Sequence, residues 1–169
     1  MLRAYESDPG IPHSALIVFG PFMRTEAQEL FLARIGRLDA VEAITFDARI
    51  EHLMQGAVGV VGMGGYNTFC EILSFDKPAL IVPRTKPRLE QYIRAARATE
   101  LGLISMLDDD KSHDPQLMAT ALRQLTQQRR PSEIVLPGLL DGLDNTNQLA
   151  GQWLARGRAA DLAVVGTKT

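Results

Sequence analysis

The sequence is poor in the residues that build disulfide frameworks, metal sites and base-driven active sites. Of its 169 residues, one is a cysteine and three are histidines. The single cysteine, Cys70, excludes an internal disulfide and fits a reducing compartment. No histidine lies near Cys70 in the sequence, so we interpret it as a small buried helix residue rather than as a nucleophile.

Strong net charge and long apolar runs are also missing. Eighteen basic and 20 acidic residues give a net charge of -2, which gives no reason to expect nucleic acid as a partner. No apolar run approaches the roughly 20 residues of a membrane span, and no signal-peptide pattern is visible at the N-terminus. Together with the reduced cysteine, these features predict a cytoplasmic protein.

Two common nucleotide-binding motifs are absent. In a Gly-x-Gly-x-x-Gly pattern starting at Gly62, the third glycine would fall on Asn67, and no Gly-Lys-Ser/Thr follows to make a P-loop. The acidic run Asp108-Asp109-Asp110 is followed at once by Lys111, which is typical of a solvated turn rather than a metal site. We therefore expect no bound metal.

The stretch from Gly56 to Glu71 organises the rest of the chain. Its apolar run at 57–61 predicts a strand buried in a parallel sheet, and residues 62–65, here called the glycine turn, let the backbone bend sharply. Thr68 and Glu71 have capping-box spacing, which predicts a helix start. Free N–H groups at a helix start suit phosphate. The residues alone leave two interpretations open: a diphosphate site, or an ordinary turn that connects a strand to a helix in an α/β fold.

Strands alternate with helical patterns along the whole chain, which predicts an α/β fold with a doubly wound parallel sheet of about five strands. Strands are expected at 14–19, 41–46, 57–61, 79–82 and 103–106. The cluster Asp8-Pro9-Gly10-Ile11-Pro12 predicts that residues 1–13 form an extended linker. Residues 14–156 are expected to form the domain, and residues 157–169 a flexible tail.

Helix starts and apolar faces can also be predicted. Thr25 and Gln28 have capping-box spacing, and Asn145 is expected to cap the last helix. The helix that Glu90 opens is expected to pack through Leu89, Tyr92, Ile93 and Ala96. The last helix has an apolar stripe that either packs on the domain's own sheet or awaits a partner, formed by Leu149, Ala150, Trp153 and Leu154.

A family resemblance favours the diphosphate interpretation. The resembling motifs are Gly65-Tyr66-Asn67-Thr68, Glu71, Lys77-Pro78, Pro83 and Glu90-Gln91. This pattern resembles the donor-sugar signature of GT-B glycosyltransferases, including the UDP-glycosyltransferases. It is even more similar to the C-terminal half of the peptidoglycan N-acetylglucosaminyltransferase family. The resemblance implies a Rossmann-like, donor-binding C-terminal half of a GT-B fold, with a nucleotide sugar, expected to be UDP-linked, as the ligand and no other cofactor.

The resemblance also implies roles for the central residues. Glu71 would accept hydrogen bonds from both ribose hydroxyls, since a carboxylate offers two acceptor oxygens. Its rival role as the capping-box partner of Thr68 stays open at this point. Four residues would hold the diphosphate through backbone N–H groups and a hydroxyl: Gly64, Gly65, Asn67 and Thr68.

Three further residues complete the implied site. Glu90 and Gln91 would hydrogen-bond the sugar hydroxyls, although Glu90 also suits a helix start by charge alone. The family usually has a histidine two residues before the glycine that matches Gly65, and here that position is Met63. We therefore expect the helix end and Arg84 to supply the positive field, unless the basic loop that carries Arg84 is only a solvated surface.

The function predicted from this resemblance is donor binding in a glycosyltransferase that transfers a hexosyl or N-acetylhexosaminyl group to an unknown acceptor. No residue of the chain is assigned as the general base. We expect this chain to be inactive alone and to need an N-terminal acceptor domain or a partner subunit, through which peripheral membrane contact would arise. The alternatives are a nucleotide-sugar epimerase of the same fold and a non-catalytic interaction domain that uses the Trp153 helix.

Overall fold

The chain divides into two units that are described separately. In the computed structural model the described residues are 1–46, 49–134 and 141–155. The units are Met1–Ile134 and Val135–Thr169. The domain predicted for 14–156 therefore includes residues of both units, and the predicted tail at 157–169 lies outside the described residues.

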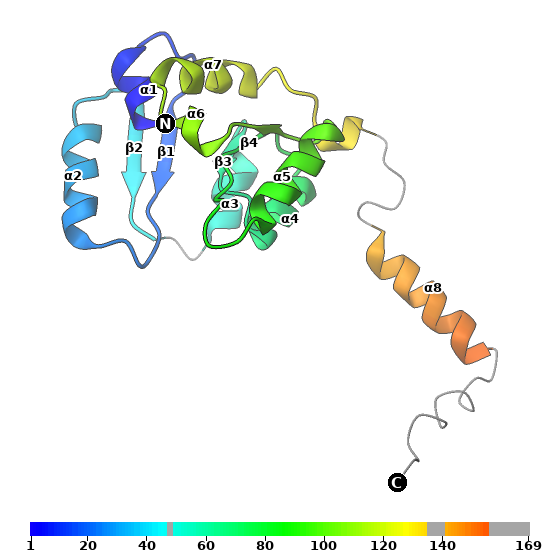
Figure 1. Cartoon of the computed structure of the whole chain (residues 1–169). Coiled ribbons are helices and arrows are strands. Elements are labelled where there is room, and N and C mark those ends of the chain that lie inside the picture. The colour runs from blue at the N-terminus through cyan, green and yellow to red at the C-terminus, as the bar shows by residue number, and fades with distance from the viewer. Residues whose placement is uncertain (47–48, 135–140, 156–169) are drawn as a thin grey trace. The chain divides into compact units, whose positions relative to one another are not determined.

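The described residues of the first unit form five strands in two sheets, and the strands within each sheet are parallel (Figure 1 labels β1 to β4). The two-stranded sheet pairs β1 (Ala15–Val18) with β2 (Val41–Ile44). The three-stranded sheet has the order β3 (Val60–Gly62), β4 (Ala79–Ile81) and β5 (Ser105–Met106). The parallel α/β fold is confirmed, whereas the single sheet that the sequence predicts is divided, since no ladder joins β1 to β3 in the described part of the chain.

A helix follows each of the five described strands, as the alternating pattern predicts. In chain order the helices that connect and follow the strands are α2 (Thr25–Ile35), α3 (Ile50–Gly56), α4 (Tyr66–Ser74), α5 (Glu90–Glu100), α6 (Asp109–Ser112) and α7 (Pro115–Leu125). A 3-10 turn, Pro131–Glu133, ends the described part of this unit. Because the strands within each sheet are parallel and joined by such crossovers, the loops that follow them leave from one edge of that sheet.

The N-terminal segment is a helix, so the predicted linker at 1–13 is wrong for its first half. Helix α1 (Leu2–Ser7) packs beside α7 and buries Leu2, Ala4 and Tyr5 (Figure 1). The proline and glycine cluster does break the chain after α1. The residues before it bury an apolar stripe with helical spacing, which outweighs the extended preference of the cluster.

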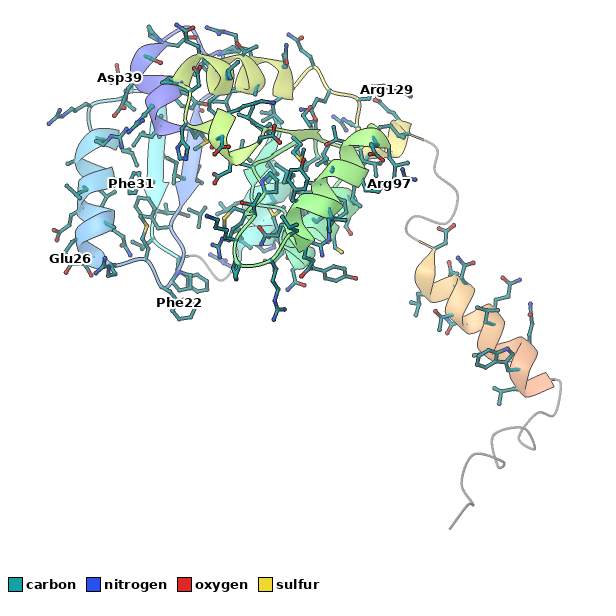
Figure 2. The ribbon with its side chains drawn as sticks, in the orientation of Figure 1. Phe22, Glu26, Phe31, Asp39, Arg97 and Arg129 are labelled. Atoms are coloured by element: carbon teal, nitrogen blue, oxygen red, sulfur yellow. The ribbon has the colours of Figure 1, made fainter. Side chains whose placement is uncertain are left out.

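The core of the first unit draws on both sheets. Phe19 directly follows β1, Val41 belongs to β2, and Leu80 belongs to β4 of the three-stranded sheet. Helices α1 and α7 complete the cluster, with α7 contributing Met118, Ala119, Leu122 and Leu125. Helix α2 contributes Ile35 to the same cluster, and its Phe31 packs against the cluster with its ring centroid 6.2 Å from that of Phe19 (Figure 2). One shared core thus ties the two sheets together.

Two predicted capping boxes do not form. The N-cap of α2 is Arg24, so Thr25 already lies in the helix, and Gln28 Nε2 donates to the carbonyl of Met23 at 2.8 Å. Helix α4 has Gly65 as its N-cap and begins before Thr68. Both helices start at the residue where the backbone leaves the preceding turn. A threonine followed three residues later by glutamine or glutamate does not by itself locate that residue.

The predicted apolar face of α5 is also wrong. Leu89 and Ile93 are 55% and 63% exposed, whereas Ala95 and Ala98 are buried. Small alanine side chains let the helix lie close to its neighbours, and the larger apolar side chains remain outside. The sequence predicts the opposite face of α5 because the large apolar residues lie there.

The second unit contains one described helix, α8 (Gly142–Ala155). Asn145 lies inside α8, where its N–H donates to the carbonyl of Asp141 at 2.9 Å, so the predicted cap is wrong. Within this unit the side chains of Leu149 and Trp153 are exposed. In the described residues, no helix has both the length and the hydropathy required for a membrane span.

Candidate functional site

The glycine turn leads from β3 into α4 and depends on Gly64. Gly64 is buried and has φ = +74°, a left-handed conformation that side chains rarely adopt. A Cβ on Gly64 would lie 2.8 Å from Cγ2 of Ile81, which is fully buried in β4. Both the backbone angle and the close approach to β4 therefore require glycine here.

Helix α4 begins with an open N-terminus. Its N-cap, Gly65, has no side chain to accept a hydrogen bond, and the first helical bond is donated by the N–H of Phe69 to the carbonyl of Gly65 at 2.9 Å. The N–H groups of Asn67 and Thr68 have no acceptor among the described residues. These groups, with the positive end of the helix dipole, can receive an anion.

Glu71 lies on the same face of α4 as this open end. It follows Asn67 by four residues and Thr68 by three, the spacings that place helical side chains over one another. Its side chain is half-buried and forms no hydrogen bond or ion pair with any described residue. Because Thr68 is inside the helix, the capping-box role of Glu71 is not realised. The carboxylate remains available to a ligand.

The loop after β4 approaches the glycine turn through Arg84. The Nη2 atom of Arg84 lies 3.8 Å from the sulfur of Met63, so a cation does reach the position where the resembled family has histidine. The backbone N–H of Arg84 donates to Oε1 of Gln91 at 3.2 Å. Gln91 thereby fixes the loop through its carbonyl oxygen and keeps its amide NH₂ group free of described partners.

Arg94 was not predicted from the sequence, and it makes the most direct contact between α5 and the glycine turn. Its Nη1 donates to the carbonyl of Gly64 at 2.9 Å, and its Nη2 donates to the carboxylate of Glu90. Its guanidinium carbon lies 5.5 Å from the ring centroid of Tyr66. The spacing of Glu90 and Arg94 could have revealed the ion pair, since residues four apart on a helix are neighbours. No local pattern reveals the contact with Gly64.

A pocket of about 490 Å³ opens beside the turn. It lies at the carboxyl ends of β3 and β4, and its walls include Gly62, Met63, Val82, Arg84, Asp109 and Ser112. Among the eight residues predicted for the site, Arg84 alone lines this pocket. The others lie in the turn and on α4 and α5, so the pocket adjoins the predicted site through Met63 and Arg84 rather than containing it.

The acidic run after β5 is part of a helix start. Asp108 precedes α6, and Lys111 Nζ donates to its carboxylate at 2.8 Å. This hydrogen bond raises the pKa of Lys111 above its ordinary value. Across residues 1–46, 49–134 and 141–155, no three histidine, cysteine or acidic side chains are grouped so that they would hold a metal ion.

The sequence from residue 14 to residue 133 matches the glycosyltransferase family 28 C-terminal domain. The chain belongs to this family. The matched region contains all five strands together with the glycine turn, Glu71 and the Glu90–Gln91 pair. A comparison with curated proteins gave no match.

Two solved glycosyltransferase structures share the fold. The glycosyltransferase VinC in complex with DTDP has a TM-score of 0.58 and 24% identity, over 74% of this chain and 29% of that chain. The glycotransferase of kitacinnamycin has a TM-score of 0.51 and 19% identity, over 72% of this chain and 36% of that chain. The family 28 domain described here therefore spans about a third of the length of these proteins and has the Rossmann-like fold of a GT-B C-terminal domain.

Proposed function

We propose that the first unit binds the nucleotide-sugar donor of a glycosyltransferase, with a UDP-sugar as the ligand. The observation that carries this proposal is the open N-terminus of α4, which directly follows the turn that contains the left-handed Gly64. The carboxylate of Glu71, which has no partner among the described residues, lies on the same face of this helix. An anion site and a carboxylate on one helix match a ligand that joins a diphosphate to a ribose.

In this arrangement the diphosphate lies at the start of α4. Gly64 and Gly65 let the backbone approach it, and the free N–H groups of Asn67 and Thr68 donate to its oxygens. Negative charge grows on the diphosphate as the bond to the sugar breaks, so donors already aimed at it lower the barrier electrostatically. Glu71 accepts from the two ribose hydroxyls.

Glu90 and Gln91 face the sugar. Arg94 occupies one carboxylate oxygen of Glu90, which leaves the other as an acceptor, and Gln91 keeps its amide NH₂ as a donor. An acceptor beside a donor suits adjacent sugar hydroxyls. We propose that the group held there is a hexosyl or N-acetylhexosaminyl group, with Arg84 supplying positive charge near the leaving group.

The acceptor site and the general base belong to another domain or to a partner subunit in this proposal. Support comes from length, since the chain spans about a third of the glycosyltransferases whose fold it shares. We expect the isolated chain to bind donor without transferring sugar. Contact with a membrane surface, if the acceptor is a lipid, would arise through the other part.

Calorimetric titration with UDP, UDP-N-acetylglucosamine, dTDP and GDP tests the proposal. We expect selective binding of the uridine nucleotides and a 10- to 100-fold loss of UDP affinity in Glu71→Ala, because hydrogen bonds to a charged group are worth about 1.5–3 kcal/mol. Glu29→Ala, an exposed change on α2, is the matched control. Undiminished affinity in Glu71→Ala, or no binding of any nucleotide, would contradict the proposal. Epimerisation of the UDP-sugar by the chain alone would favour the epimerase alternative instead.

A further inference from the structure

We infer that Arg94 is a positioning residue, which holds the glycine turn in the conformation that the diphosphate needs and links it to the sugar-binding Glu90. This inference rests on the function proposed above and extends it to a residue outside the predicted set. Arg94 acts through other groups rather than on the ligand itself, because both nitrogens that it directs toward the site are occupied by groups of the protein.

The contact with Gly64 controls the direction of a neighbouring N–H. The carbonyl of Gly64 and the N–H of Gly65 belong to one planar peptide group, in which they point in opposite directions. Arg94 fixes the carbonyl on the α5 side at 2.9 Å. The Gly65 N–H, which has no acceptor among the described residues, is thereby turned to the other side of the turn. Glycine peptides rotate easily, so this restraint has a direct effect on where the donor points.

The surroundings of Arg94 make it a rigid restraint. Its side chain is 19% exposed and lies over the ring of Tyr66, the first residue of α4. Its planar guanidinium contacts the turn with one nitrogen and Glu90 with another, a geometry that lysine cannot reproduce with a single ammonium group. One side chain therefore joins the end of the turn, the start of α4 and the start of α5.

This connection predicts coupling between the two parts of the donor. A sugar that binds Glu90 restrains Arg94, and Arg94 in turn restrains the turn that receives the diphosphate. The gain in affinity from adding the sugar to UDP should therefore be larger in the wild-type chain than in a chain without the arginine.

The experiment compares Arg94→Ala and Arg94→Lys with Arg97→Ala. Arg97 lies on the same helix, is 68% exposed and pairs with Glu100, so its loss serves as the matched control (Figure 2). Nitrogen-15 relaxation of the Gly64 and Gly65 amides reports the rigidity of the turn, and calorimetry compares UDP with uridine. We expect both Arg94 variants to loosen the turn and to weaken UDP about 10-fold, with uridine affinity unchanged, whereas Arg97→Ala has neither effect.

The outcomes separate this inference from the proposed function. An unchanged turn in Arg94→Ala overturns the positioning role, whatever the nucleotide data show. Wild-type behaviour of Arg94→Lys would mean that charge alone matters and also overturns it. Equal losses for UDP and uridine would indicate a general folding defect and contradict the inference. If the wild-type chain binds no UDP, the proposed function fails, and the relaxation data still decide whether Arg94 holds the turn.

Discussion

At the scale of single residues, the two adjacent glycines of the turn carry different constraints. Gly64 has φ = +74°, and a Cβ there would meet the side chain of Ile81 at 2.8 Å. Gly65 has φ = -55°, and a Cβ there would have no atom within 4 Å. The first position requires glycine for its fold, whereas the second accepts a side chain without a clash.

Alanine substitutions should separate these positions. Gly64→Ala should lower the free energy of unfolding by about 2 kcal/mol or more, since the left-handed backbone costs about 1–2 kcal/mol and overpacking adds about 1–3 kcal/mol. Gly65→Ala should cost less than about 1 kcal/mol, the usual effect of a poorer N-cap. Urea denaturation of both variants measures the difference. Equal losses at the two positions would contradict the packing described for Gly64.

The residue scale also shows how much of the site the sequence could predict. The glycine turn and Glu71 could be placed on one strand–turn–helix unit because all of these residues are close in sequence. The rivalry between a cap and a ligand role for Glu71 could not be decided before the start of α4 was known. The bond from Arg94 to Gly64 joins residues 30 positions apart, and no periodicity describes such a contact.

At the scale of elements, α1 and α2 are joined by a paired ion contact. Arg34 donates through Nε and Nη2 to the two carboxylate oxygens of Glu6, each at 2.7 Å. This hydrogen bonding lowers the pKa of Glu6 below its ordinary value of 4.5 and raises that of Arg34. Both side chains are about a third exposed, so water and salt weaken the pair.

The pair makes a small part of the stability depend on pH. Because folding lowers the pKa of Glu6, its contribution is complete well above pH 4.5 and is lost as the pH falls through the lower folded value. Glu6→Gln should therefore be less stable than wild type by up to about 1 kcal/mol at pH 7. Near pH 3 the difference should shrink.

Denaturation at both pH values measures this change, with Glu29→Gln on α2 as a control that has no ion pair among the described residues. A difference between Glu6→Gln and wild type that stays constant from pH 7 to pH 3 would argue against the ion pair as its source.

The sequence predicts the positions of the strands better than the starts and packed faces of the helices. Strands were located well because buried parallel strands are apolar runs with sharp ends. The start of α5 at Glu90 is confirmed, whereas the predicted starts of α2 and α4 are too late, because Thr25 and Thr68 already lie inside helices that begin at the preceding turn. The packed face of α5 was missed because its contacts use alanine, which a search for large apolar residues passes over.

At the scale of the whole first unit, α1 is part of the core. Tyr5 is 7% exposed, contributes to the cluster with α7, and donates from its hydroxyl to the carbonyl of His13 at 2.9 Å. Burial raises the pKa of this hydroxyl. The ion pair between Asp8 and Arg123 adds a second connection between the N-terminal segment and α7.

Removal of the Tyr5 side chain should therefore weaken the entire unit. We expect Tyr5→Ala to lower the free energy of unfolding by about 3 kcal/mol, the scale of aromatic-to-alanine changes in cores. Arg3→Ala on the exposed side of α1 should change it by less than about 0.5 kcal/mol. Thermal and chemical denaturation check both values. A negligible effect of Tyr5→Ala would restore the view of this segment as a linker.

The place of Met1 has a practical consequence for any chain joined to it. Met1 forms part of the pocket wall beside Met63 and Arg84. Whatever is attached ahead of it, a purification tag or a further domain, leaves the fold at the rim of that pocket. A short linker keeps the attached tag or domain at a high local concentration beside the pocket. A tag at this end would compete for the same space, whereas a fused domain would hold its own ligand within reach of the pocket without needing high affinity for the unit itself.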